Sequence, residues 1–383
     1  MRAILDGVIH TATEQGTIEG DILFDEEKII DVGADISIPD EAKTLDIGGG
    51  HVTPGLIDAH SHVGVAEWGE PEDNDVDEST NPVTPHVNAV DGFNPRDYGL
   101  KLARQAGITT VSTRMGSANV IGGVISSMKT AGTTVESMRL DEEGMKAALG
   151  ENPKRIHGTE QGREPSTRPG IAAVLRREFT RAEDYRDRRL SADDREVPFE
   201  RDLGLENLVR VLEGELALRV HAHRADDILT AFRIADEFGI DRLSIEHATE
   251  GHLIAEEFAS RNVPAIVGPG LVTARKYELS NITFETAARL DEAGVKVALQ
   301  TDAPVTPQHY LDISAGLAIR GGLDPEAALH AVTRNPAEIL GIDDRVGTLS
   351  SGTDADLVVW DGPFYEATTC SQHVFIDGTR ING

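Results

Sequence analysis

The sequence predicts an α/β fold in which a (β/α)8 barrel is joined to a small β-sandwich. Short apolar strands alternate with amphipathic helices through the middle of the chain, and short strands separated by turns occupy both ends. The length of 383 residues suits a barrel of roughly 250 residues with a second, smaller layer. We assign residues 1–52 and 347–383 to the sandwich and residues 53–346 to the barrel.

The strands expected at the two ends of the chain are too few and too short to form separate stable sheets. At the start of the chain, short β patterns cover Arg2–Ile9, Asp21–Phe24 and Lys28–Val32. Near its end, Asp356–Trp360 and His373–Asp377 have the same character. Together, these segments can form one composite β-sandwich that brackets the barrel.

The middle of the chain repeats a strand–helix unit. A helix is expected over Asp226–Phe238, with Gly239 as its C-cap, followed by the strand Leu243–Glu246. Asp324, followed by Pro325 and a glutamate, is a strong helix start. The other expected elements are the strands Val263–Val267 and Lys296–Gln300 and the helix Phe284–Glu292.

Residues 151–202 depart from this pattern, and we expect a loop or an insertion there. Glu151–Gly170 is rich in Gly, Pro, Lys and Arg, which predicts a long ordered loop. Phe179–Asp202 is a dense run of mixed charges, which predicts a solvated helix or an inserted segment.

The composition narrows the class of protein. A net charge of −30, from 66 acidic and 36 basic residues, argues against nucleic acid or an anionic membrane as a partner, and we interpret it as a hydrated, halophile-like surface. The single cysteine, Cys370, excludes an internal disulfide and a cysteine-based zinc site. No apolar stretch approaches the roughly 20 residues of a membrane helix, and no signal peptide is recognisable. We therefore expect a cytoplasmic protein.

The strongest local signal is the segment Pro54–His62, an apolar strand that ends in His60 and His62. The i, i+2 spacing puts both imidazoles on one face of a strand, which is half of a zinc-type site. Three more candidate ligands each follow an apolar strand, where a barrel holds its catalytic groups: His221, His247 and Asp302. We predict that these five side chains surround one or two divalent metal ions, with zinc the natural choice for a nitrogen-rich shell.

The chain resembles the amidohydrolase superfamily over nearly its whole length. The likeness is carried by Pro54-Gly-Leu-Ile-Asp-Ala-His60-Ser-His62 and by the closing Gly347-Thr-Leu and Gly352-Thr-Asp-Ala-Asp-Leu-Val-Val. Gly150–Arg155 and His221–Ile228 are similar to the imidazolonepropionase-related branch. The resemblance implies a metal-dependent hydrolase of non-peptide carbon–nitrogen bonds, acting on a cyclic amide, an N-acyl amino acid or an isopeptide-like substrate.

The resemblance also implies a role for each ligand. His60 and His62 match the ligands of the more buried metal, and His221 and His247 match those of the second metal. Asp302 matches the last-strand ligand that also serves as general base. Two-metal members carry a carboxylated lysine on the fourth strand as a bridge, and our choice for it is Lys146.

Alternatives to this reading stay open at the level of sequence. Lys129 competes as the bridging lysine, although its segment Val124–Thr130 could form a β-hairpin with Thr134–Arg139. Lys146 could instead be a surface lysine in the first turn of a helix. Without a bridging lysine the site would be mononuclear and deaminase-like, with His247 as a base. A non-catalytic scaffold is disfavoured because every ligand position is filled.

Several polar residues on expected rim loops are candidates for substrate binding. Basic groups beside a metal centre in so acidic a protein suggest recognition of a substrate carboxylate, although salt bridges to the abundant acids would explain them equally well. His223 either binds the substrate or supports a ligand. We expect a small-molecule substrate, and a homo-oligomer is compatible with the resemblance. The basic candidates are Lys154, Arg155, Arg168 and Arg224.

Overall fold

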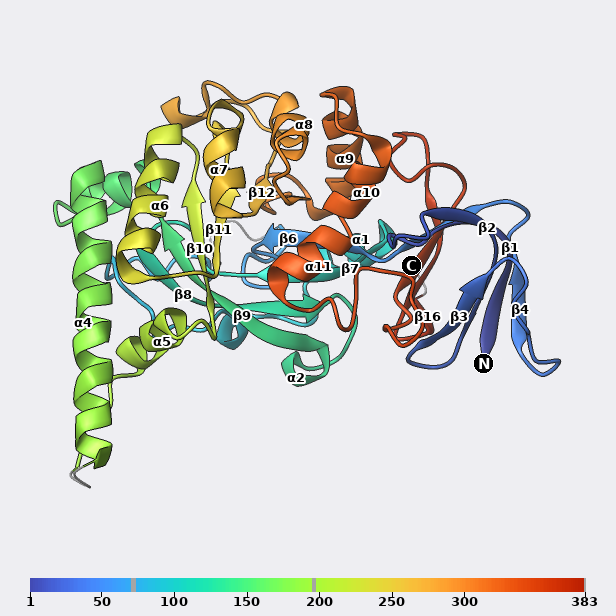
Figure 1. Cartoon of the computed structure of the whole chain (residues 1–383), viewed down its shortest axis with the longest axis horizontal. Coiled ribbons are helices and arrows are strands. Elements are labelled where there is room, and N and C mark those ends of the chain that lie inside the picture. The colour runs from blue at the N-terminus through green and yellow to red at the C-terminus, as the bar shows by residue number, and fades with distance from the viewer. Residues whose placement is uncertain (70–73, 195–197, 382–383) are drawn as a thin grey trace.

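A computed structural model of the chain describes residues 1–69, 74–194 and 198–381. Its strands form two eight-stranded sheets. In Figure 1 the barrel sheet occupies the centre, the sheet built from both chain ends lies on the right, and the long helix α4 stands on the left. None of the helices in the described part of the chain is both long and apolar enough to cross a membrane.

The barrel sheet contains eight strands that pair in the order of the chain, and the last strand, β13, contacts the first, β6. The sheet is therefore nearly closed, as the alternation of strands and helices predicted. The residues of β6, β7, β10 and β11 are buried throughout, as expected for strands covered on both faces. The strands are β6 (Leu56–Ser61), β7 (Ile108–Thr113), β8 (Ile121–Lys129), β9 (Arg139–Ala148), β10 (Ala217–Ala222), β11 (Leu243–His247), β12 (Ala265–Val267) and β13 (Val297–Leu299).

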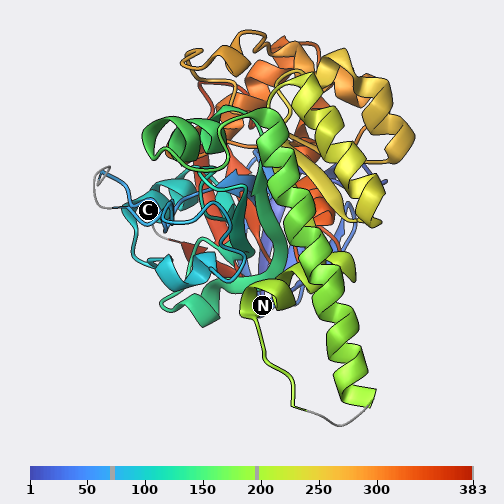
Figure 2. The same ribbon diagram turned by 90° about the vertical axis from the view of Figure 1, so that its left-hand side faces the viewer.

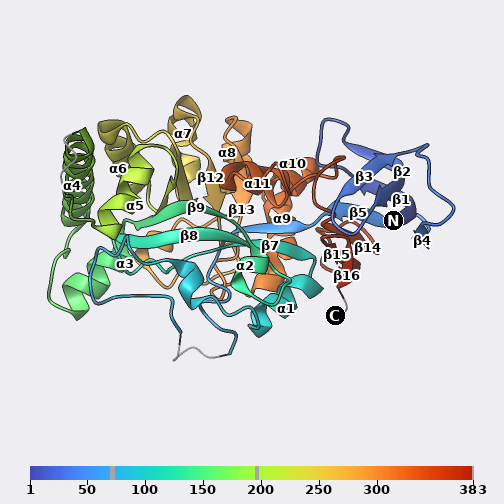
Figure 3. The ribbon, with the colours of Figure 1, turned by 90° about the horizontal axis from the view of Figure 1, so that it is seen from below.

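The barrel is not parallel throughout, because β8 runs antiparallel to both β7 and β9. These three strands lie side by side in Figure 3. The hairpin considered for Val124–Thr130 therefore exists, but the partner suggested for it was wrong. Ser127 pairs with Asp141 in β9, while α2 (Val135–Met138), started by a Thr134 capping box, occupies most of the segment expected to be the second arm.

The two ends of the chain meet in the second sheet, because β5 pairs with β14. Its core includes Ile4, Ile22 and Val52 from the N-terminal segment and Leu357 and Phe375 from the C-terminal one. The expected association of the two ends is confirmed, whereas the sandwich form and the domain boundaries stay predictions. The strands are β1 (Arg2–His10), β2 (Thr17–Phe24), β3 (Ile29–Gly33), β4 (Lys43–Asp46), β5 (His51–Pro54), β14 (Leu357–Trp360), β15 (Ser371–Ile376) and β16 (Thr379–Ile381).

The helices pack on the outside of the barrel, with α6 to α10 along its upper side in Figure 1. Gly239 ends α6 in the left-handed conformation, with φ of 64°, and the side chain of Asp324 caps α10, both as predicted. The longer helices are α1 (Tyr98–Gln105), α4 (Arg168–Asp194), α5 (Leu203–Leu212), α6 (Ala225–Phe238), α7 (Ala255–Arg261), α8 (Glu285–Glu292), α9 (Leu311–Arg320), α10 (Pro325–Ala331) and α11 (Arg334–Leu340).

The atypical region 151–202 is largely helical. The loop expected over Glu151–Gly170 is interrupted by α3 (Glu151–Pro153) and by the helical turn η2 (Lys154–Glu160), so that part of the prediction was wrong. Pro153 is compatible with a helix here because it lies in the first turn, where its missing N–H is not needed. The solvated helix is confirmed, since α4 runs to Asp194 and its far end extends beyond the neighbouring helices in Figure 2.

Lys129, at the end of β8, joins the barrel to the terminal sheet. Its Nζ lies 2.6 Å from an oxygen of Asp354, 3.0 Å from Asp356 and 2.5 Å from Asp377. Burial alone would lower the pKa of Lys129, but the three carboxylates hold it above its ordinary value. Lys129 therefore forms ion pairs with these acids, and it is not the bridging lysine of the site.

We expect Lys129→Met to lower the free energy of unfolding by about 3–5 kcal/mol, because it leaves the buried carboxylate of Asp356 without its cation. Urea denaturation followed by circular dichroism measures this change. The matched variant Lys43→Met, at an exposed position of β4, should stay within about 0.5 kcal/mol of the unmodified chain. Equal midpoints for both variants would contradict the assigned link.

Candidate metal centre

The side chains predicted to bind metal come from the carboxyl ends of four barrel strands. His60 lies in β6 and His62 directly follows it, His221 lies near the end of β10, His247 ends β11, and Asp302 follows β13. All five are largely withdrawn from solvent. A barrel brings these strand ends to one mouth, which is where its loops form a reaction site.

Asp302 lies at the centre of the first group of ligands. Its Oδ1 is 3.3 Å from Nε2 of His60 and 3.2 Å from Nε2 of His62. His60, His247 and Asp302 each offer a ligand atom, and these atoms lie within 4.8 Å of one another. Such an arrangement can hold a metal ion with mixed nitrogen and oxygen ligands.

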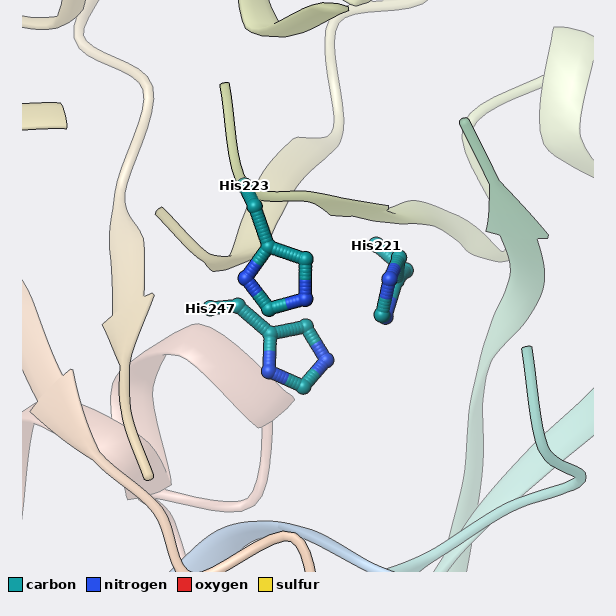
Figure 4. Close-up of side chains that lie close together, drawn as sticks. All are labelled: His221, His223 and His247. Carbon is teal, nitrogen blue, oxygen red and sulfur yellow. The ribbon is translucent and has the colours of Figure 1, made fainter. Parts of the chain in front are cut away.

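A second group consists of His221, His223 and His247, whose ligand atoms also lie within 4.8 Å of one another. Figure 4 shows the three imidazoles gathered around a common space. The ring centroids of His221 and His247 are 4.2 Å apart, and those of His223 and His247 are 4.6 Å apart. His223, which we expected to contact the substrate or a ligand, therefore lies close enough to be a ligand itself.

The inward-facing nitrogens of these rings have no hydrogen-bond partner among the described residues. Nε2 of His60, His221 and His247 is buried and forms no hydrogen bond with the described residues, although Nε2 of His60 lies 3.3 Å from Oδ1 of Asp302. On the other side of the rings, Nδ1–H of His60 donates to Glu246 at 2.6 Å, and Nδ1–H of His247 donates to the Gly268 carbonyl at 2.9 Å. These outer bonds select the tautomer with a free lone pair on Nε2. A buried acceptor without a partner is costly, so a metal ion fits this set of residues.

The same histidines are neutral at physiological pH. Burial, with the nearby charge of Lys146, lowers the pKa of His60 to about 4. Burial and Lys276 lower the pKa of His223 to about 3. Burial also holds the pKa of His221 and His247 well below the ordinary value. Neutral imidazole is the form that binds metal, so no proton has to be displaced from these rings.

Lys146 lies in β9, the fourth strand of the barrel, and is fully buried. Its Nζ has no partner among the described residues. The alternative of a surface lysine in a helix is therefore wrong, because the acidic run ahead of it belongs to the same strand. Burial, reinforced by Arg114, lowers the pKa of Lys146 to about 8. In the sheet, Lys146 pairs with Arg219, two residues before His221, and Ala148 pairs with His221 itself.

Hydrogen bonds connect the backbone segments around the site, and two of its residues have positive φ angles. Asp58, in the first strand, accepts the N–H of His60 at 3.1 Å and that of Thr301 at 3.2 Å, while the N–H of Asp302 donates to the His60 carbonyl at 3.2 Å. His247 and Asp302 have φ of 71° and 54°, in the left-handed region that non-glycine residues seldom adopt. Such conformations gather at functional sites, where the surrounding structure enforces them.

The sequence analysis missed the residues that support His60. Arg114 and Glu246 are both fully buried, and Nη1 of Arg114 donates to Oε2 of Glu246 at 2.6 Å. Burial alone would raise the pKa of Glu246, but Arg114 and His60 hold it well below its ordinary value. The available signal was a glutamate inside an apolar strand, directly before His247.

A cavity of about 760 Å³ opens onto His62, His221, His223 and Asp302. The basic candidates Lys154, Arg155, Arg168 and Arg224 are not among the described residues that line it. Arg155 pairs with Glu160, Arg168 with Asp227 at 2.9 Å and Arg224 with Asp226 at 2.8 Å.

Two cationic side chains that the sequence analysis did not select, Arg275 and Lys276, line the cavity instead. Asn74, Val76 and Asp77 also line it; they belong to the acidic stretch Glu67–Glu78 after β6, of which residues 70–73 lie outside the described part of the chain. The signal for Arg275 and Lys276 was their position in the long connection after β12.

Known proteins resemble this chain in sequence. The model of the Amidohydrolase family matches residues 51–381. Amidohydrolase tasK of Hapsidospora irregularis is 30% identical over 94% of this chain, which spans 39% of that relative. Imidazolonepropionase of Bacillus velezensis is 27% identical over 41% of the chain, which corresponds to 37% of that enzyme. The chain thus spans about two-fifths of the length of these curated relatives.

Solved structures agree with this assignment. The crystal structure of an amidohydrolase from Thermotoga maritima covers all of both chains with a TM-score of 0.96 and 42% identity. A prolidase aligns over 99% of both chains with a TM-score of 0.61 and 17% identity, which shows the fold alone. The chain therefore belongs to the amidohydrolase family, whose members are generally metal-dependent.

Proposed function

We propose that this chain hydrolyses a non-peptide amide bond in a small molecule, with two divalent metal ions and with Asp302 as general base. The substrate classes that fit are a cyclic amide, an N-acyl amino acid and an isopeptide-like compound. The observation that carries the proposal is a set of buried nitrogens that form no hydrogen bond with the described residues: Nε2 of His60, His221 and His247, and Nζ of Lys146.

The two groups of ligands favour two metal positions. His60, His62 and Asp302 would hold one ion, and His221 and His247 the other. The nitrogen-rich donor set suits zinc. A single ion in either group would leave unpartnered nitrogens in the other, which is why we favour the binuclear form over a mononuclear, deaminase-like one.

Lys146 would bridge the two positions as a carbamate. Carbon dioxide reacts with a neutral amine, and a pKa of about 8 leaves an appreciable neutral fraction of Lys146 near physiological pH. Carboxylation replaces an unpartnered buried cation by an anion with two oxygens, which is the kind of group that a dication attracts.

The proposed reaction adds water to the amide carbon and breaks the carbon–nitrogen bond. When bound, divalent metal ions supply a Lewis acid that acidifies water and polarises a carbonyl group. Although burial raises the pKa of Asp302, the surrounding histidines hold it well below its ordinary value, so the carboxylate is ionised and can accept the proton of the attacking water. It then returns this proton to the leaving nitrogen, and the products are a carboxylic acid and an amine.

His223 is placed to contact the reacting group from the cavity side. It lines the cavity, and its Nδ1 lies 2.8 Å from the hydroxyl of Thr249. If that hydroxyl donates to Nδ1, the Nε2–H of His223 is available to a substrate oxygen. Charge that develops on this oxygen during attack would be stabilised by such a donor.

The first prediction of this proposal concerns Lys146. We expect the unmodified chain to contain two metal ions and one carbamate, and Lys146→Met to lose the carbamate and at least one ion per chain. Elemental analysis measures the metal, and native mass spectrometry measures the carbon dioxide adduct. Lys43→Met should retain both ions. One metal per chain with unmodified Lys146 would support the mononuclear alternative instead.

The second prediction concerns Asp302. Asp302→Asn should lower kcat by about 10²–10⁴-fold, the usual contribution of a general base, because the amide cannot accept the proton. Thermal unfolding and most of the bound metal should be preserved. The exposed Asp91→Asn is a matched control and should be fully active. Full activity of Asp302→Asn would defeat the assigned role.

A further inference from the structure

The cavity in front of the candidate metal centre has a size suited to a small molecule. One of its walls is basic. Its volume of about 760 Å³ falls in the range typical of ligand sites. Of its described lining residues, Arg275 and Lys276 are the ones that carry lysine or arginine charges. Both belong to the connection between β12 and α8, which also contributes Leu271 and Leu279 to the lining.

Arg275 has no acidic partner in the described part of the chain. Its Nε lies 3.3 Å from the hydroxyl of Thr273, and no carboxylate of the described residues forms an ion pair with it. The arginines elsewhere on the rim behave differently, since Arg168 and Arg224 are each held by an aspartate. In a chain with 66 acidic and 36 basic residues, an unpaired arginine at the cavity is an unusual placement.

The positive charge of Lys276 is only weakly neutralised by a nearby carboxylate. Its nearest acid is Glu278, with Nζ and Oε1 3.7 Å apart. Glu278 is shared, because its other oxygen accepts the N–H of Glu151 at 2.8 Å, and Arg168 lies 3.7 Å away. Lys276 thus keeps much of its positive field, and this field reaches the neighbouring ligand, where it helps to lower the pKa of His223.

The other acids among the described lining residues, Asp77 and Asp302, form no ion pair with Arg275 or Lys276. Asp302 lies among the ligand histidines, and Asp77 accepts the backbone N–H of Ala118 at 3.1 Å. Next to the cations, the wall is apolar and partly exposed, with Leu271 at 39% and Val305 at 57% exposure. An anionic group with an apolar neighbour would therefore complement this part of the cavity.

We infer that Arg275 and Lys276 bind a carboxylate of the substrate, and that the preferred substrate is an amide carrying a free carboxylate next to an apolar group. This inference rests on the proposed function, because it names the substrate class of the same site. The guanidinium group of Arg275 suits paired hydrogen bonds to a carboxylate, and the ammonium group of Lys276 adds a second charge.

Matched acids and carboxamides test this inference. The substrates are N-acetyl-L-leucine with N-acetyl-L-leucinamide, and pyroglutamate with pyroglutamamide, assayed at low ionic strength with metal-loaded protein. We expect kcat/KM to favour the acids at least about tenfold. In the double variant Arg275→Gln, Lys276→Gln this preference should fall by about 10- to 100-fold, mainly through a higher KM, because the charged hydrogen bonds to the carboxylate are lost.

The control is the double variant Lys101→Gln, Arg233→Gln, which removes the same charge from exposed positions of α1 and α6. It should keep the acid preference. An independent measurement is calorimetric binding of hexanoate, which should weaken by a similar factor in the cavity variant and not in the control. This binding assay decides the inference even where turnover is too slow to compare.

The outcomes separate the two proposals. Hydrolysis of amides without a preference for the acid, or a preference that survives in the cavity variant, would overturn this inference and leave the proposed function intact. Hexanoate binding that is equal in both double variants would also overturn it. Failure of the metal-loaded chain to hydrolyse any amide of a broader panel would count against the proposed function, whatever the hexanoate result.

Discussion

The metal centre depends on a set of charges buried inside the barrel. Arg114, Glu143, Arg219 and Glu246 are almost completely withdrawn from solvent. Arg114 lies 2.6 Å from Glu246 and 3.5 Å from Glu143, and Arg219 lies 3.9 Å from Glu143. Two cations and two anions balance, which is necessary because an isolated buried charge costs several kcal/mol. Since Glu246 also accepts the N–H of His60, this balance orients the first metal ligand.

Lys146 lies outside this balanced set of four charges. Its neighbours in the interior already pair with one another, and its own Nζ has no partner among the described residues. A low pKa relieves part of the cost by favouring the neutral amine, and conversion to a carbamate would reverse the sign of the charge. Because these four charges already pair within their own set, Lys146 stays available for the metal centre.

The barrel and its ligand histidines could be predicted because their signals are local. His60, His221 and His247 each lie at or near the end of a short apolar strand, and strand ends of a barrel meet at one mouth. The choice between Lys129 and Lys146 could not be made in this way. Both lie in strands, and what distinguishes them is that Lys129 meets carboxylates more than 200 residues later in the chain. The reversed direction of β8 is likewise a property of its long-range pairing.

Charge neutralisation explains why the basic residues of the rim were the hardest to assign. Arg224 is paired with Asp226, only two residues away, so its neutralisation is visible in the sequence. Sequence proximity alone is not sufficient, however, because Glu278 lies three residues after Arg275 and yet turns into the protein, where it accepts the N–H of Glu151. The path of the connection after β12 thus separates the acid from the arginine, and this separation leaves a positive charge facing the cavity.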